Sequence, residues 1–218
     1  MSNSPRYEPL IEFEPAMHAY YLDGRRFSHS VTEVLTGAGF YNPEYFTDEQ
    51  RERGRAVHEI TAEFDHTGRT DLRRVPEKYR GYVRAWEQYK RDSQIECFQH
   101  IEQIVICPEL DYAGTLDRGN PVIRKGGSLV IVDEIDDIKT NERGMIYSPV
   151  RIQLVGYGYA RHPRHICRRR AVCLRPNGEY TTAIYSPSTW QADLAEWVRA
   201  LDRVRGVECH HQESKSVM

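Results

Sequence analysis

The sequence predicts an α/β (α+β) fold in which helices flank a central mixed β-sheet, and three observations support this class. Helical and extended patterns follow one another as helices, three strands, a helix, two strands and a final helix. The middle of the chain is rich in β-branched residues between turn signals. The length of 218 residues suits one compact core, so we expect a single domain over residues 1–218.

The N-terminal part of the chain is expected to form a hairpin followed by helices. The hairpin is predicted over residues 11–28, because aromatic-rich runs flank the turn dipeptide Asp23-Gly24. Ser30 can cap a short helix that ends at a glycine. A longer helix is predicted over residues 47–65, where apolar residues recur every four positions.

The rest of the chain can be assigned in the same way. Pro76 begins a helix with an apolar stripe along one side. After it we expect strands over residues 95–106, 112–118 and 128–138, a helix near 149–161, a hairpin over 165–186 around Asn177-Gly178, and a final amphipathic helix capped by Ser188. The tail from about residue 207 is polar and is expected to fray.

Composition and charge restrict the classes of function. Hydrophobic residues make up 39% and charged residues 28%, as in soluble globular proteins. No run is apolar enough for a membrane span or a signal peptide, so we expect a cytoplasmic location in a bacterium or a phage-infected host, and no membrane partner. The net charge of −2 does not indicate a nucleic-acid partner. One basic cluster, residues 161–170, is either a solvated loop and strand edge or a phosphate contact.

The five cysteines do not predict a disulfide framework or a metal cluster. Their number is odd, and no pair has the tight spacing of metal ligands. Cys167 and Cys173 flank an arginine-rich segment and are interpreted as ordinary strand residues. We therefore expect no iron–sulfur cluster.

Asp117, Asp137 and Lys139 form the most informative pattern. Side chains alternate along a strand, so Asp137 and Lys139 point the same way. Asp117 ends the segment that begins at Gly114, on the preceding strand. If the two strands are neighbours, both carboxylates can converge on one cation, as Mg²⁺ prefers. The alternative interpretation is that these residues are surface charges on an exposed strand.

Three further residues have both an ordinary and a functional interpretation. His58 lies beside the apolar face of the helix predicted over residues 47–65, where a histidine is more often structural. Gln153 and Tyr157 are four residues apart on a predicted helix, so they share one face. Alone, they indicate only the edge of a core.

Together these residues resemble the RecB-type branch of the PD-(D/E)xK nuclease superfamily. The motifs that carry the resemblance are, in chain order, His58, Gly114-x-x-Asp117, Asp137-x-Lys139 and Gln153-x-x-x-Tyr157. It extends over about residues 11–205. The segments around His18-x-Tyr20, Ser30 and residues 53–58 are similar to phage and prophage members. The resemblance implies a restriction-endonuclease-like core.

The resemblance also implies a role for each motif residue. The implied ligands of Mg²⁺ or Mn²⁺ are His58, Asp117, Asp137 and the backbone carbonyl of Ile138. Lys139 would orient or deprotonate the attacking water and stabilise the developing charge. Gln153 and Tyr157 would position the DNA strand or the metal shell. Asp117, Asp137 and Lys139 are thus the implied catalytic residues.

Residues 132–140 depart from the family pattern, in which an apolar run leads straight into the motif. This stretch holds four neighbouring acids, Asp133, Glu134, Asp136 and Asp137. In a regular strand Asp133 and Asp137 share one face with Lys139, and the other two acids share the opposite face. Asp137 has the family spacing to Lys139, so we assign it to the site and keep Asp133 as the backup acid. A β-bulge would change this assignment.

The implied function is a Mg²⁺- or Mn²⁺-dependent deoxyribonuclease. The resemblance favours an exonuclease that hydrolyses phosphodiester bonds in phage or bacterial DNA recombination, replication or repair. Its partners would be single- or double-stranded DNA and a recombination or replication protein. The alternatives are a non-catalytic DNA- or protein-binding module on the same fold, or a structure-specific endonuclease. The number of metal ions, the polarity, the strand preference and the oligomeric state stay open.

Overall fold

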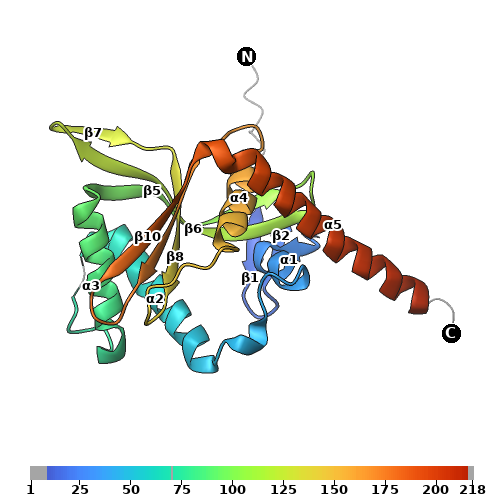
Figure 1. Ribbon diagram of the computed structural model, residues 1–218, viewed down its shortest axis with the longest axis horizontal. Helices are drawn as coiled ribbons and strands as arrows, with labels where there is room; N and C mark the ends of the chain where they lie inside the picture. The colour runs from blue at the N-terminus through green and yellow to red at the C-terminus, as the bar shows by residue number, and fades with distance from the viewer. Residues whose placement is uncertain (1–8, 70, 216–218) are drawn as a thin grey trace, which may run out of the picture.

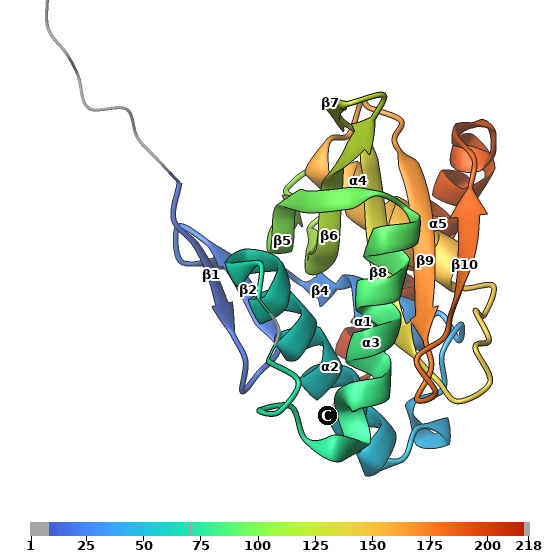
Figure 2. The ribbon, with the colours of Figure 1, turned by 90° about the vertical axis from the view of Figure 1, so that its left-hand side faces the viewer.

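A mixed β-sheet lies at the centre of the molecule and helices cover both of its faces (Figure 1 and Figure 2). This confirms the predicted fold class. The computed structural model describes residues 9–69 and 71–215, and the side chains as far as residue 206. Within these ranges, no helix is both long and apolar enough to cross a membrane.

The central sheet has seven strands, and β6 is its most connected member. The strands are β4 (His29–Ser30), β5 (Ile95–Cys107), β6 (Tyr112–Lys125), β7 (Ser128–Ile131), β8 (Glu134–Thr140), β9 (Arg168–Leu174) and β10 (Tyr180–Tyr185). Strand β6 pairs antiparallel with β5, β7 and β8, and parallel with β4. Strand β9 is parallel to β8 and antiparallel to β10. The sheet is therefore mixed.

The third strand predicted in the middle of the chain, residues 128–138, is two strands separated by a bulge. Ile131 on β7 pairs with Val122, whereas Ile135 on β8 pairs with Gly119. Four steps along β7 and β8 thus correspond to three steps along β6, so one extra residue is accommodated between them. A bulge of this kind shifts the side chains that precede it to the other face. Asp133 lies within this irregular stretch and consequently does not share a regular face with Asp137.

The N-terminal segment forms a separate small sheet rather than a single hairpin. Its strands are β1 (Ile11–Glu14), β2 (Ala19–Leu22) and β3 (Arg25–Arg26). The predicted turn at Asp23-Gly24 connects β2 to β3, and both of its residues have positive φ. This is the geometry that favours Asp-Gly in a tight hairpin turn.

In the part of the chain that the structure describes, five α-helices lie between and after the strands. They are α1 (Val31–Gly37), α2 (Asp48–Thr67), α3 (Glu77–Asp92), α4 (Val150–Arg161) and α5 (Trp190–Lys215), with short 3₁₀ helices at Pro43–Tyr45 and Pro187–Thr189. Ser30 and Thr47 cap α1 and α2 with complete capping boxes. Gly68 ends α2 in a left-handed conformation.

The predicted cap of the final helix is wrong, although α5 begins at Trp190, close to the predicted start. Ser186, and not Ser188, accepts the capping hydrogen bond, and it starts the 3₁₀ helix that leads into α5. The physical reason is Pro187, which lacks an N–H and suits the first helical position. The tail from about residue 207, predicted to fray, is helical as far as Lys215, and its side chains lie outside those that the structure describes.

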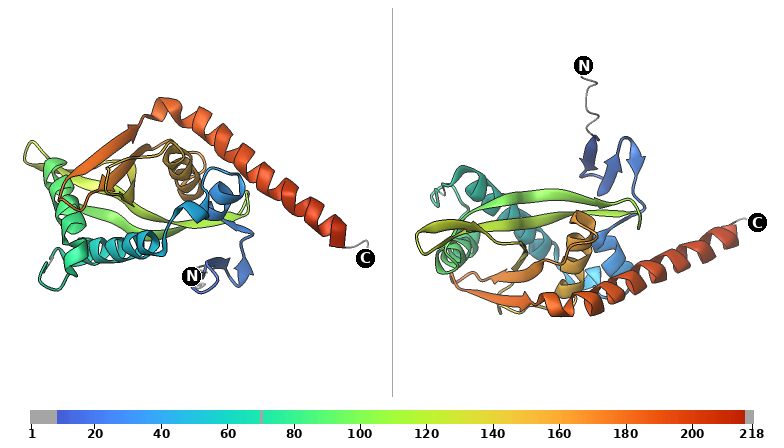
Figure 3. Two further views of the ribbon diagram at one scale, coloured as in Figure 1. Left: turned by 60° about the horizontal axis from the view of Figure 1, so that its bottom comes forward. Right: turned by 90° about the horizontal axis from the view of Figure 1, so that it is seen from above.

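The helices form two layers around the sheet, each with its own core. Helices α2 and α3 pack on one face through a cluster that includes Val57, Trp86 and Ile138. Helices α1, α4 and α5 pack on the other face through a cluster that includes Leu35 and Trp197. Figure 3 shows the two layers and α5 running out past the edge of the sheet.

The four cysteines with described side chains are free. Cys173 lies on β9 and Cys167 directly precedes that strand, and both are buried. Cys97 and Cys107 lie on β5. Cys209 lies outside the described side chains.

Gly114 allows α4 to approach β6 closely. A Cβ atom at Gly114 would lie 2.7 Å from Cε1 of Tyr157. We expect Gly114→Ala to displace the Tyr157 ring and to lower the free energy of unfolding by ~1–3 kcal/mol, measured by urea denaturation. The matched control is Gly54→Ala within α2, where a Cβ meets nothing within 4 Å and should stabilise the helix. Equal stability of the Gly114 variant and the parent would contradict this account.

Candidate active site

Strands β6 and β8 stop pairing at the two motif aspartates. The last paired residues are Arg118 and Asp136, so the next residues, Asp117 and Asp137, stand opposite each other where the strands separate. The backbone N–H of Ile138 has no β6 carbonyl to bond and instead donates to Oδ2 of Asp117 at 2.6 Å. Because β6 and β8 separate here, their backbone and side-chain groups no longer pair across the sheet. These groups lie between α2 and α4.

His58 reaches this opening from α2 and is oriented by the backbone of β8. Its Nε2 lies 2.9 Å from the carbonyl oxygen of Ile138. A carbonyl can only accept a hydrogen bond, so Nε2 carries the proton. The Nδ1 atom then faces the carboxylates of Asp117 at 3.5 Å and Glu102 at 3.8 Å. In the neutral imidazole, Nδ1 carries a lone pair, and this lone pair is directed at the two carboxylates.

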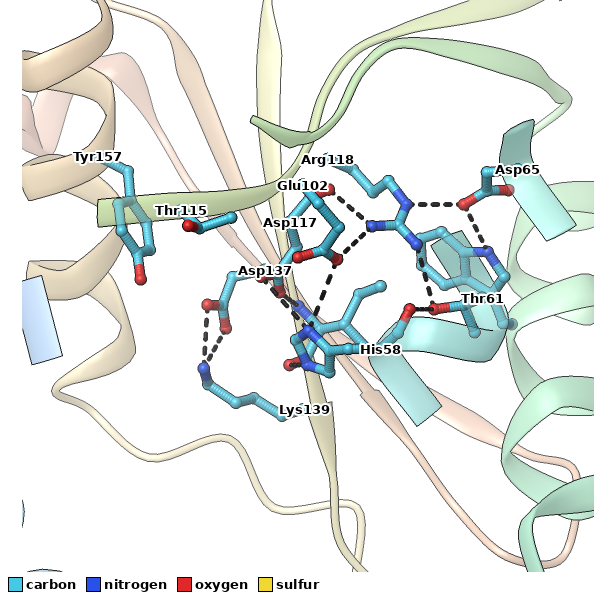
Figure 4. Close-up of polar contacts among 12 residues, drawn as sticks. His58, Thr61, Asp65, Glu102, Thr115, Asp117, Arg118, Asp137, Lys139 and Tyr157 are labelled. Carbon is cyan, nitrogen blue, oxygen red and sulfur yellow. Dashed lines mark hydrogen bonds and ion pairs between the residues drawn. The ribbon is translucent and has the colours of Figure 1, made fainter. Parts of the chain in front are cut away.

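His58, Glu102 and Asp117 form a group that suits a divalent cation. Their ligand atoms all lie within 4.8 Å of one another, and Figure 4 shows the three side chains pointing toward one another. One imidazole nitrogen and two carboxylates are donors that Mn²⁺ and Mg²⁺ accept. A histidine whose second nitrogen donates to a backbone carbonyl is also the usual arrangement at a metal. The donor set therefore fits a metal.

Glu102 is the member of this group that the sequence pattern did not indicate. It lies in the middle of β5, opposite Asp117 in the register of β5 with β6. Its φ of 48° is unusual for a strand residue that is not glycine. Such backbone strain concentrates at functional sites. The signal in the sequence is weak, because nothing about the strand pattern distinguishes Glu102 from Glu96, which pairs with Arg124 at the surface.

A second line of contacts connects β8 to α4. The ammonium Nζ of Lys139 lies 2.9 Å from Oδ1 and 2.7 Å from Oδ2 of Asp137. The same ammonium donates to Oε1 of Gln153 at 3.1 Å, and the Gln153 amide donates to the hydroxyl of Tyr157 at 3.2 Å. The structure thus places these four residues in one chain of contacts beside the His58 group.

Burial shifts the pKa of several groups here. Burial, reinforced by the charge of Asp117, raises the pKa of Glu102 to about 7. Burial also raises the pKa of Asp137 to about 6, although Lys139 opposes it. For Lys139, burial alone would lower the pKa, but the Asp137 carboxylate, with smaller contributions from Tyr41 and Asp117, raises it above the usual value. Lys139 is therefore an ammonium at neutral pH.

The other three acids of the β8 stretch have partners elsewhere. Asp133 is exposed and its Oδ2 lies 2.6 Å from Nε2 of His165. Glu134 and Asp136 are buried on the α3 side, where Glu134 binds Arg170 and Asp136 accepts from Tyr89. Asp137 is the acid of this stretch that lies beside Lys139.

The basic cluster of residues 161–170 is largely neutralised by its own contacts. Arg168 and Arg170 pair with Glu134, and Arg169 pairs with Asp193 at 2.8 Å. Arg161 donates to the side chain of Asn120. These contacts favour a structural role for most of the cluster.

Comparisons with known proteins give distant structural likenesses. No protein-family model and no curated protein matches the chain. Among solved structures, it is similar to an alkaline exonuclease (LHK-Exo) from Laribacter hongkongensis, with 10% identity and a TM-score of 0.41 over 87% of this chain and 94% of that chain. The complex of LHK-Exo with dAMP gives 11% identity and a TM-score of 0.41 over the same shares, 87% and 94%. SSO0001 gives 13% identity and a TM-score of 0.29 over 76% of this chain and 84% of that chain.

Proposed function

We propose that this chain is a metal-dependent DNA nuclease of the PD-(D/E)xK type. The observation that carries the proposal is the meeting of His58, Glu102 and Asp117 beside the Asp137–Lys139 pair. These residues come from α2, β5, β6 and β8, and only folding brings them together. A nitrogen and two carboxylates next to a half-buried ammonium are the groups needed to hold a cation and a phosphodiester.

His58, Glu102 and Asp117 would hold the Mg²⁺ or Mn²⁺ ion. The bound ion would supply Lewis-acid chemistry at the scissile phosphate and activate water. Asp137 lies next to this group, with both its oxygens near Lys139. The carbonyl of Ile138, which the family resemblance implies as a ligand, binds His58 and so would act through that side chain.

Lys139 would act as a cation and not as a proton acceptor. Its pKa is raised by the neighbouring carboxylate, so the ammonium keeps its proton at neutral pH. A charged ammonium can orient the attacking water and neutralise charge that develops on the phosphate oxygens. Gln153 fixes the ammonium from the other side, and Tyr157 supports Gln153. These two residues would position Lys139 and the DNA strand.

The finer parts of the proposal rest on the order of the motifs. They are a restriction-endonuclease-like core and an exonuclease in phage or bacterial DNA recombination, replication or repair. A single domain follows from the chain length, and a cytoplasmic location is proposed from the composition of the sequence. DNA, single- or double-stranded, would be the substrate.

The proposal is tested by cleavage of defined DNA. Purified protein is incubated with end-labelled linear duplex, linear single strands and closed circles, with Mg²⁺, with Mn²⁺ or with a chelator. We expect loss of the linear substrates only when metal is present, and intact circles. Cleavage of circles would favour the endonuclease alternative. Intact DNA across a broad metal screen would contradict the proposed activity.

One observation favours a second function, a non-catalytic DNA- or protein-binding module. Asp137 is directed at Lys139 rather than at the group formed by His58, Glu102 and Asp117. If this pair is permanent, neither side chain is available for chemistry. If the chain is such a module, it should retain DNA without cleaving it and should not bind Mn²⁺ tightly. Tight Mn²⁺ binding that is lost in Asp117→Ala would count against it.

Metal binding at this group should release a proton below neutral pH. Glu102, with a pKa of about 7, is protonated in more acidic solution, and a ligand must be a carboxylate. The apparent affinity for Mn²⁺ should therefore fall by about tenfold per pH unit below about pH 7, and level off above it. Calorimetry in two buffers of different ionisation enthalpy measures the released proton. Glu102→Gln should reduce the release, because only His58 then has a proton to lose, and a release equal to that of the parent would contradict the assignment.

A further inference from the structure

Arg118 is a fully buried cation directly behind the candidate metal group. It follows Asp117 on β6, and its side chain is 0% exposed. Its guanidinium donates to Oδ2 of Asp65 at 2.7 Å, to Oε1 of Glu102 at 2.8 Å, to the carbonyl of Asp117 at 2.6 Å and to the hydroxyl of Thr61 at 3.1 Å. Figure 4 shows Arg118 between Asp65 and Glu102.

Asp65 anchors this arginine to the helical layer. Asp65 lies on α2, and its buried carboxylate accepts from Trp86 at 3.0 Å and from Lys90 at 2.6 Å, both on α3, as well as from Arg118. Lys90 and Arg118 together carry two positive charges against the single charge of Asp65. One positive charge therefore remains for Glu102, which is the partner of Arg118 that faces the candidate site.

Glu102 needs such a partner for both its position and its charge. Its backbone is held at a φ of 48°, and its carboxylate lies near the carboxylate of Asp117. Like charges at this separation repel each other, and burial disfavours both. A guanidinium presents several N–H groups in a fixed fork, so it can hold the Glu102 carboxylate and the Asp117 backbone in one geometry.

We propose that Arg118 is a positioning residue that sets the Glu102 and Asp117 carboxylates for the cation. This inference rests on the metal group of the proposed function. Arg118 is buried behind the carboxylates and acts through them. Its anchoring to Asp65 and Thr61 connects the geometry of the metal group to the packing of α2 on the sheet.

A second buried arginine provides a matched comparison. Arg169 is also 0% exposed, and it also donates to an aspartate, a threonine hydroxyl and a backbone carbonyl. Those partners are Asp193, Thr189 and Arg151, and none of them belongs to the metal group. The two arginines are thus equally buried and have the same kinds of hydrogen-bond partner. They differ in that Arg118 also contacts Glu102.

The test compares Arg118→Lys with Arg169→Lys. Each substitution keeps the positive charge and removes the forked set of guanidinium N–H donors, so both variants should unfold at lower urea concentration than the parent. We expect Arg118→Lys to bind Mn²⁺ about 10- to 100-fold more weakly by calorimetry, and Arg169→Lys to bind it within about twofold of the parent. Equal Mn²⁺ affinity in folded Arg118→Lys and the parent would overturn the proposal, as would an equal loss in both variants.

A milder variant covers the case in which Arg118→Lys does not fold. Thr61→Val keeps the side-chain shape and removes one anchor of the guanidinium, so Mn²⁺ affinity should fall by about fivefold. Unchanged affinity in that folded variant would then overturn the proposal. DNA cleavage by the parent is scored separately. A parent that binds Mn²⁺ and leaves DNA intact contradicts the nuclease alone, whereas a parent that binds no Mn²⁺ overturns both.

Discussion

Lys139→Ala is expected to lower the rate of DNA cleavage by about 100- to 1,000-fold, because it removes the fixed, partly exposed positive charge beside the candidate metal group. The ammonium is held by Asp137 and Gln153, so in the parent it is already oriented before substrate arrives. Such preorganised charge stabilises a transition state without a cost of reorientation. Single-turnover cleavage of an end-labelled linear duplex at saturating Mg²⁺ measures the change.

The same variant should keep its metal site. Lys139 contacts none of His58, Glu102 and Asp117 through a hydrogen bond, so the affinity for Mn²⁺ should stay within about threefold of the parent. The control is Lys78→Ala, which removes an exposed lysine paired with Glu52. It should leave cleavage unchanged. Cleavage by Lys139→Ala at the rate of the parent would rule out a catalytic role for this lysine.

Asp117→Asn is expected to weaken Mn²⁺ binding by more than about 100-fold, and DNA cleavage should be lost with it. A residue that only supports a ligand typically changes affinity by about 10- to 100-fold, and Asp117 would be a ligand itself. The amide oxygen of asparagine can still accept the bond from the Ile138 N–H. The free energy of unfolding of the metal-free protein should therefore stay within ~1 kcal/mol of the parent. Calorimetry with Mn²⁺ and urea denaturation measure the two quantities.

Asp133→Asn is the matched control, since it also neutralises an aspartate close to the motif strand. Asp133 is exposed, pairs with His165 and lies in the bulged stretch between the pairs of Ile131 and Ile135. We expect its affinity for Mn²⁺ and its cleavage rate to equal those of the parent. If Asp133→Asn lost metal binding and Asp117→Asn kept it, the metal site would lie elsewhere and the assignment of Asp117 would be wrong.

Local chemistry explains why most elements could be predicted. The capping boxes at Ser30 and Thr47 and the left-handed Gly68 involve residues within a few positions of one another. Their preferences are properties of the local chain and need no tertiary partner. The final helix shows the limit of this reasoning, because two serines flank Pro187 and the position of the proline decided between them.

The candidate site could be predicted only in part. The spacing of Asp137 and Lys139, and of Gln153 and Tyr157, is local, and the structure brings these four residues into one chain of contacts. Which of the four neighbouring acids lies beside Lys139 depended on a bulge that is defined only by pairing with β6. Strand parity cannot reveal an extra residue until the partner strand is known.

The sequence by itself indicated most of the helices and strands, the caps at Ser30 and Thr47 and the turn at Asp23-Gly24, and it proposed His58, Asp117, Asp137 and Lys139 as the motif residues. Only the tertiary structure decided that Glu102 joins His58 and Asp117, and that Arg118 stands behind them. The reason is that these contacts join residues far apart in the chain, and they depend on the register of β5 with β6 and on the packing of α2 against the sheet. Such long-range contacts leave no periodic pattern in the chain.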